Sequence, residues 1–178
     1  KNELKEYLLL ITEQQLDPLA LKGSYAGAMG IPQFIASSYR NFGIDFDQSG
    51  KIDLHNNIPQ VIGSIANYFK VHGWQSGAPV IYKAKINGSR YKQLQVAARN
   101  NPMPDITLKT LKQYGITPIT KIQDPNIQAA LLEFHNGDKT EYWLGLNNFY
   151  VITRYNNSSN YALAVHQLGT AIQKSYQP

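Results

Sequence analysis

A run of small residues between two apolar segments constrains the fold of this chain more than any other feature of its sequence. Six of the eight residues from Gly23 to Gly30 are Gly, Ala or Ser. With so few bulky side chains, the backbone can adopt left-handed conformations and approach another group closely. We interpret the run as part of a binding site; an ordinary flexible surface loop is the alternative. The residues in or just after it that can contact a ligand are Ser24, Tyr25, Met29, Gln33 and Phe34.

The apolar residues on either side of this loop follow helical spacing. Leu4, Leu8 and Ile11 predict a mostly buried helix over residues 3–15. After the loop, Pro32 suits the first turn of a helix, so a short helix is expected to begin at Gln33 and Phe34 and to run to Phe42. Backbone N–H groups at that start would be free for a ligand.

Two further helices are predicted by longer apolar stripes. Ile58, Ile62 and Ile65 lie on the apolar face of an amphipathic helix over residues 58–69, with Tyr68 at the edge of that face. A comparable pattern over residues 161–172 predicts the last helix, which we expect to close the core.

Between about residues 77 and 140 the pattern changes to that of a small β lobe. Alternating apolar residues over 80–86 predict a strand that ends in a turn at Asn87-Gly88. Thr107 is expected to cap a short helix that stops at Gly115. Strands over 127–134 and 140–144 flank Asn136-Gly137 and predict a hairpin.

These elements predict a mainly α protein of the α+β class. We expect residues 1–76 to form part of a helical core that carries the glycine-rich loop, residues 77–144 to form a small mixed α/β insertion, and residues 145–178 to return to the core as helices. A chain of 178 residues can bury a sizeable core, as one domain or as a core with a small inserted lobe.

Composition narrows the choice of partners. The 17 Lys and Arg exceed the 12 Asp and Glu, which suggests an anionic partner, but the basic residues are scattered singly, so we expect no nucleic acid. Zero cysteines fit an oxidising and a reducing compartment equally. No stretch approaches the ~18 apolar residues of a membrane span, so any membrane attachment is expected through an anchor upstream of this chain.

Several blocks of sequence, in order along the whole chain, resemble the lytic murein transglycosylase B family of bacterial cell-wall enzymes. This resemblance implies a lysozyme-like helical core with an inserted β lobe. It also implies a periplasmic or cell-envelope location, either soluble or anchored to the outer membrane, and peptidoglycan glycan strands as the partner. The blocks are Lys22–Phe34, Ser37–Tyr39, Asp45–Asp47, Ile62–Phe69, His72–Trp74, Asn148–Asn156 and Tyr161–Val165.

The family cleaves the MurNAc-β-1,4-GlcNAc bond and forms 1,6-anhydro-MurNAc, so the resemblance implies one glutamate that acts first as acid and then as base. That glutamate belongs to a family motif expected upstream of Lys1, so this chain would supply the substrate cleft and be inactive alone. Glu13 is the alternative acid within the chain, and we do not favour it, because exposed helix carboxylates usually only solvate a surface. No cofactor is expected to be required.

The resemblance also assigns residues to the cleft. Ser24 matches a serine near the sugar N-acetyl group, and Gln33 and Phe34 match residues that line the cleft beside it. Tyr25 and Met29 share their loop. Aromatic, amide and hydroxyl groups of this kind suit sugar rings and their acetamido groups. The remaining matches are Tyr68 on the long helix and the C-terminal cluster of Tyr155, Asn156 and Tyr161.

A pattern like the calcium loop of an EF-hand follows. Asp45, Asp47, Ser49 and Lys51 stand at its positions 1, 3, 5 and 7. The closing carboxylate is missing, and the resemblance places Gln60 at that point. Two interpretations stay open: a weak calcium site that fills at millimolar calcium, or an Asx-rich turn before the helix.

Three functions remain as hypotheses. The first is the cleft portion of a peptidoglycan lytic transglycosylase. The second is a non-catalytic module that binds peptidoglycan glycan without cutting it. The third, a calcium-dependent structural module, is disfavoured by glutamine in place of the closing carboxylate.

Overall fold

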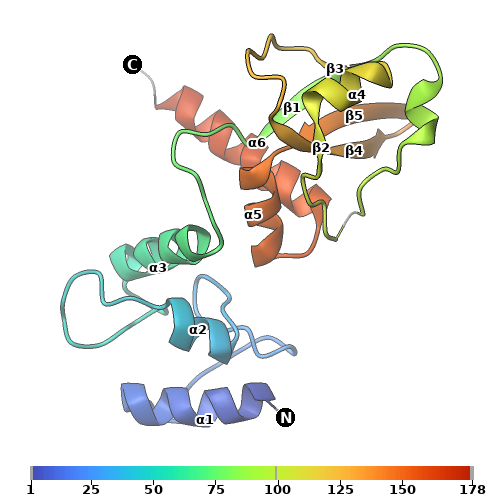
Figure 1. The fold of residues 1–178 in the computed structure, drawn as a ribbon. Helices are drawn as coiled ribbons and strands as arrows, with labels where there is room; N and C mark the ends of the chain where they lie inside the picture. The colour runs from blue at the N-terminus through green and yellow to red at the C-terminus, as the bar shows by residue number, and fades with distance from the viewer. Residues whose placement is uncertain (1, 99, 177–178) are drawn as a thin grey trace. The chain divides into compact units, whose positions relative to one another are not determined.

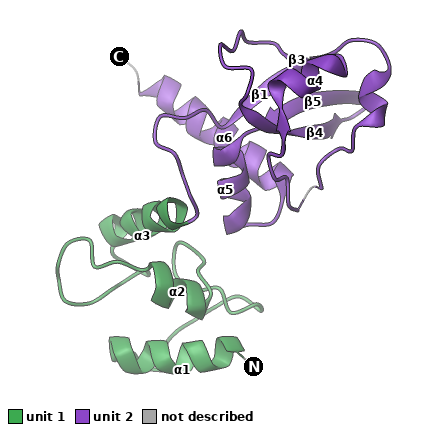
Figure 2. Ribbon diagram, in the orientation of Figure 1, with its two compact units in different colours: residues 1–71 green, residues 72–178 purple. Residues whose placement is uncertain are grey.

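The computed structural model describes residues 2–98 and 100–176 of the chain (Figure 1). The chain divides into two compact units, Lys1–Val71 and His72–Pro178 (Figure 2). Residues 145–176 lie in the same unit as the β lobe, and the expected division of the chain at residues 76 and 144 stays a prediction. The return of residues 145–176 to the first helical core depends on how the units are arranged and also stays a prediction.

Unit 1 contains helices α1 (Asn2–Gln14), α2 (Ala36–Phe42) and α3 (Ile58–Val71). The predicted helix over residues 3–15 is confirmed as α1, but the expectation that it is mostly buried is wrong. Leu10 is its only buried residue among those described, whereas Leu4 is 64% and Leu8 53% exposed. The helix is tied to α2 by polar pairs, because Arg40 binds the carboxylates of both Glu6 and Glu13.

The predicted start of the second helix is also wrong. Helix α2 begins at Ala36, and Phe34 instead forms a two-way backbone bridge with Met29. The N–H groups of Gln33 and Phe34, expected to be free, donate to the carbonyls of Gly30 and Met29 at 3.3 and 3.1 Å. A local turn therefore uses the donors that a helix start would have left open.

Helix α3 is confirmed, but its buried face differs from the apolar stripe. Ile58 and Ile62 are 50% and 64% exposed, whereas Gln60 and Ser64 are fully buried. Ser64 accepts a hydrogen bond from the Ile44 N–H at 3.0 Å, which ties the helix to the segment before it. Because of such polar contacts, α3 buries Gln60 and Ser64 and leaves part of its apolar stripe exposed.

Unit 2 is a five-stranded antiparallel sheet in the order β2-β4-β5-β1-β3 with helices on both faces. Its central hairpin is the predicted one. The pairing runs from Ala130 opposite Gly145 to Asn136 opposite Lys139, with Gly137 at φ +59° in the turn. The elements are β1 (Ile81–Ile86), the 3₁₀ turn η1 (Arg90–Gln93), β2 (Ile106–Thr107), α4 (Leu108–Gln113), β3 (Ile116–Pro118), β4 (Gln128–Asn136), β5 (Lys139–Gly145), α5 (Asn147–Tyr155) and α6 (Ser159–Ser175).

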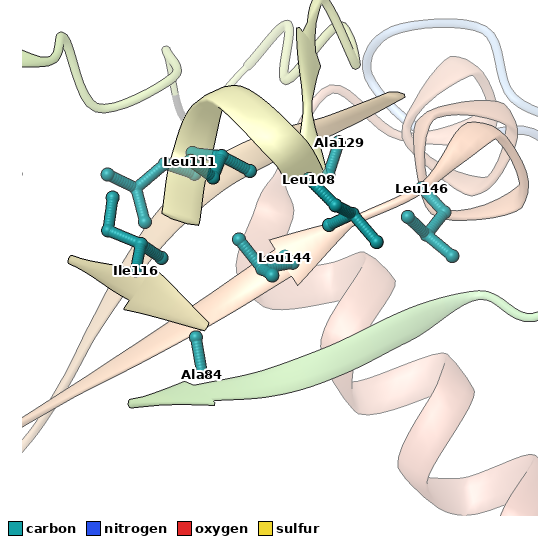
Figure 3. Packing of buried hydrophobic residues seen from close by; sticks show 8 residues of the cluster. Ala84, Leu108, Leu111, Ile116, Ala129, Leu144 and Leu146 are labelled. Carbon is teal, nitrogen blue, oxygen red and sulfur yellow. The ribbon is translucent and has the colours of Figure 1, made fainter. Parts of the chain in front are cut away.

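Both faces of β4 are buried, because successive residues of the strand enter different cores. Ala129 and Leu131 pack with Leu108 and Leu111 of α4, and Figure 3 shows this cluster gathered between α4 and the strands. On the other face, Leu132 packs with residues of α5 and α6. The sheet is therefore the middle layer of unit 2.

Local signals in unit 2 are well matched by the structure. Thr107 caps α4 by accepting the Thr110 N–H at 3.1 Å. Gly115 ends that helix at φ +81°, where an added Cβ would lie 2.1 Å from the Asn87 carbonyl oxygen. The predicted last helix is confirmed within α6, although Leu168 and Ile172 stay 62% and 49% exposed, so only its first turns close a core. No helix in the described part of the chain has the length and apolar character needed to cross a bilayer.

Candidate functional site

The glycine-rich loop is an ordered structure built from short backbone bridges. Gly23 pairs with Met29, and Met29 pairs in turn with Phe34. Within the loop, the Ser24 N–H donates to the Ala28 carbonyl at 2.9 Å, and the Ala28 N–H donates to the Ser24 hydroxyl at 3.1 Å. Isolated bridges and hydrogen bonds thus join three parts of this exposed loop, and its role as a binding site stays a prediction.

A single glycine allows the loop to rest on the segment before α3. Gly30 has φ +66°, and a Cβ there would lie 2.5 Å from the Leu54 carbonyl oxygen. That same carbonyl accepts the Ile31 N–H at 2.9 Å. Because a side chain would break this close approach, only glycine fits the position.

Gln33 is held in a conformation that non-glycine residues rarely adopt. Its φ is +54°, and its side-chain Nε2 donates to the Gly30 carbonyl at 2.8 Å. The side chain is exposed beside this turn. Strained residues of this kind persist where the surrounding structure holds them and are common at ligand sites.

The loop and α1 enclose a hollow of about 300 Å³. Ser24 and Met29 line it from the loop, and Glu3 and Tyr7 line it from α1. The Glu3 carboxylate also accepts the Ser37 N–H at 3.1 Å. Sequence reasoning missed Glu3 and Tyr7: their spacing of four puts them on one helix face, but nothing local says that this face meets the loop.

The predicted contact residues of unit 1 fall into two groups. Ser24, Tyr25 and Gln33 are exposed, and Tyr25 projects fully into solvent. Phe34 and Tyr68 are only 3% and 7% exposed and pack together with ring centroids 5.7 Å apart. The buried side of the loop therefore packs on Phe34 and Tyr68, and Met29 is buried with them. Direct contact between these three residues and a sugar stays a prediction.

The predicted C-terminal cluster lies in unit 2, where α5 ends and α6 begins. Tyr155 is the last residue of α5, and Asn156 is exposed directly after it. The Tyr161 N–H donates at 3.3 Å to the hydroxyl of Ser158, which caps α6. Burial raises the pKa of the Tyr161 phenol. These three residues lie at the junction of α5 and α6, and their gathering into a cluster beside Ser24 stays a prediction.

Glu13 is engaged in a strong ion pair. Its two oxygens accept hydrogen bonds from Arg40 at 2.6 and 2.8 Å. The hydrogen bond from Arg40 lowers the pKa of the Glu13 carboxyl. A glycosidic acid needs a raised pKa so that it holds its proton near neutral pH. The geometry therefore argues against Glu13 as the acid.

The acidic loop from Asp45 to Gln60 is closed on itself. The Gln60 side-chain nitrogen lies among oxygens of Asp45, Asp47, Ser49 and the Lys51 backbone, at 2.6 to 3.0 Å. The pKa of Asp47 lies far below its usual range, mainly because of the hydrogen bond from Asn57 and next because of the one from Gln60. The predicted ligand set thus converges on one point, and a glutamine nitrogen lies there.

Comparison with known proteins identifies the fold and family. The transglycosylase SLT domain model matches residues 1–170. This chain belongs to the transglycosylase SLT domain family. Membrane-bound lytic murein transglycosylase B of Escherichia coli (strain K12) is 44% identical over 170 residues, which are 96% of this chain and 45% of that protein.

Solved structures of the family share the fold. Soluble lytic transglycosylase SltB1 of Pseudomonas aeruginosa superposes with a TM-score of 0.88 at 44% identity, over 98% of this chain and 56% of that one. Escherichia coli lytic transglycosylase Slt35 in complex with calcium superposes at 0.84 and 43% identity, over 98% and 53%. The predicted family and the lysozyme-like α+β fold are thereby confirmed. The SLT domain described here spans about half the length of these relatives.

Proposed function

We propose that this SLT domain supplies the substrate cleft of a peptidoglycan lytic transglycosylase. In this proposal the enzyme cleaves the MurNAc-β-1,4-GlcNAc bond in the periplasm or cell envelope. The observation that carries it is the family match over residues 1–170, together with a murein transglycosylase as relative. The net charge of +5 supports attraction to the carboxylates of peptidoglycan. No cofactor enters the reaction.

The ordered loop is the part of the described chain that we assign to the glycan. Ser24 and Gln33 offer a hydroxyl and an amide to the sugar acetamido and hydroxyl groups, and Tyr25 offers an exposed aromatic face for stacking. The hollow beside Ser24 is large enough for part of a sugar unit. Tyr155, Asn156 and Tyr161 complete the cleft in this proposal.

The acid is proposed to be a glutamate upstream of these residues. It protonates the leaving glycosidic oxygen as the bond to C1 of MurNAc breaks. The same carboxylate then takes the proton of the MurNAc C6 hydroxyl, whose oxygen bonds to C1 and gives the 1,6-anhydro product without water.

The test uses purified peptidoglycan with this chain and with a version extended upstream. Mass spectrometry then searches for muropeptides that end in 1,6-anhydro-MurNAc. We expect the product from the extended version only. Glu13→Gln in the extended version serves as the matched control and keeps the activity, provided that a thermal melt shows it folded.

The other outcomes separate the remaining hypotheses. Product from the unextended chain would contradict an upstream acid, and Glu3, whose carboxylate lines the hollow, would be replaced first and Glu13 second. If neither version forms product but both sediment with peptidoglycan, the non-catalytic glycan-binding module becomes the function. Loss of both binding and product would refute both hypotheses.

A further inference from the structure

We propose that the side-chain amide of Gln60 takes the place of a cation in the acidic loop, so that this chain holds the loop without calcium. The loop has the alternating oxygen donors of a calcium site, and the relative Slt35 is described in complex with calcium. In this chain the residue that should close the site is an amide instead of a carboxylate.

The amide nitrogen lies where the ligands of a cation would converge. Gln60 Nε2 donates to Asp45 Oδ1 at 2.9 Å, Asp47 Oδ1 at 2.6 Å and Ser49 Oγ at 3.0 Å. It also donates to the Lys51 carbonyl at 2.9 Å. An amide nitrogen has two N–H bonds, so these four acceptors share them. Gln60 is fully buried, whereas Asp47 and Ser49 are exposed, so the donor end of these bonds is shielded from water and the acceptor end is not.

The orientation of the amide is determined by its other end. Gln60 Oε1 accepts the Asp53 N–H at 2.6 Å. If the amide were flipped, its nitrogen would face that N–H and its oxygen would face the two carboxylates. Both new contacts are repulsive, so the hydrogen-bond network allows only the observed assignment.

The oxygens of the loop are also occupied by its own donors. Asp45 accepts the Ser49 N–H at 2.9 Å and the Gly50 N–H at 2.7 Å, in addition to Gln60. Asp47 accepts Asn57 Nδ2 at 2.6 Å. The oxygens of both carboxylates therefore accept hydrogen bonds from donors within the loop, as in an Asx turn.

Calcium does not fit this arrangement. It takes six to eight oxygen ligands, and a closing bidentate carboxylate normally supplies two of them. Four oxygens of the chain lie within hydrogen-bond distance of Gln60 Nε2, so water would have to supply the remaining ligands. A fifth, Gln60 Oε1, becomes a ligand only if it leaves the Asp53 N–H. Of the two interpretations of this loop, the geometry supports the self-contained turn.

The test compares melting temperatures of the chain in EDTA and in about 10 mM calcium chloride, well above the dissociation constants of weak extracellular sites. We expect the parent chain to change by less than about 1 °C. Gln60→Glu restores a closing carboxylate. Calcium at about one hundred times its dissociation constant for this variant should raise the melting temperature of the variant by at least about 5 °C. Gln48→Glu, an exposed residue of the same loop with the same charge change, is the matched control and should show no response.

A second measurement on the parent chain keeps the proposal testable if Gln60→Glu does not fold. In ¹H–¹⁵N spectra, the Gln60 side-chain amide protons should exchange slowly and keep their chemical shifts during a calcium titration. Saturable shifts of these protons or of the Gly50 amide, or a calcium-dependent melt of the parent chain, would overturn the proposal. A folded Gln60→Glu variant that ignores calcium would also overturn it.

Discussion

Replacing Tyr39 with Phe removes one oxygen atom that joins α2 to the segment supporting the glycine-rich loop. The Tyr39 hydroxyl donates to the Ile52 carbonyl at 2.8 Å and accepts the Leu54 N–H at 3.1 Å. Tyr39 is 1% exposed and Leu54 is fully buried. The change leaves two backbone groups without their partner while the aromatic ring still fills the same space.

The size of the effect follows from these two groups. An unsatisfied buried polar group costs about 1–3 kcal/mol. The Leu54 N–H is shielded from water, whereas Ile52 is half-buried, so its carbonyl can recover part of the loss through water. We therefore expect the Tyr39→Phe change to lower the free energy of unfolding by roughly 2–3 kcal/mol.

Urea unfolding followed by far-UV circular dichroism measures this loss. Tyr25→Phe is the matched control, because Tyr25 is fully exposed and its loss of a hydroxyl should change the free energy of unfolding by less than ~0.5 kcal/mol. Hydrogen exchange at the Leu54 amide gives a local readout and should accelerate only in Tyr39→Phe. If Tyr39→Phe matches the control in both measurements, the hydroxyl does not support the loop and the reasoning fails.

Two further predictions concern the loop and the response to pH. Gly30→Ala should lower the free energy of unfolding by about 3 kcal/mol or more, because Gly30 has φ +66° and the added Cβ would meet the Leu54 carbonyl. Gly27→Ala is the control: its added Cβ meets open space, and it should cost about 1 kcal/mol. Equal losses for the two variants in urea unfolding would contradict this prediction. Burial raises the pKa of Tyr161, and a hydrogen bond with Tyr91 raises that of Tyr142 to about 12. Their stabilisation is complete below about pH 10, where unfolded tyrosine is neutral, and is lost as pH rises through the folded pKa values. The urea midpoint should therefore fall between about pH 10 and pH 12, and an unchanged midpoint would refute the assignment.

Local sequence rules predicted much of unit 2. The turn at Asn136-Gly137, the cap at Thr107 and the stop at Gly115 are formed as expected, because each depends on residues a few positions away. The short strands β2 and β3 were not predicted, whereas helix α5 lies within residues 145–178, which were expected to be helical. The strands have two and three residues, too few for a periodic signal, and helix α5 was recognised only as part of a family motif.

The candidate site divides in the same way. Sequence alone identified the glycine-rich run, the acidic loop with Gln60 at its end, and the family to which the cleft residues belong. It indicated neither that Glu3 lines the hollow beside Ser24 nor that the Gln60 nitrogen lies at the centre of the acidic loop. These facts depend on pairs of residues nine or more positions apart, and the position of neither partner follows from its neighbours.

Tertiary contacts also decided which residues became core. The apolar stripe of α3 predicted burial of Ile62, but the loop and the preceding segment bind Gln60 and Ser64, and the helix turns those polar residues inward. Periodicity reports how apolar residues repeat along a helix, which is a local property. The face that is buried depends on hydrogen bonds that distant segments of the chain must satisfy once water is excluded, and those become defined only when the fold forms.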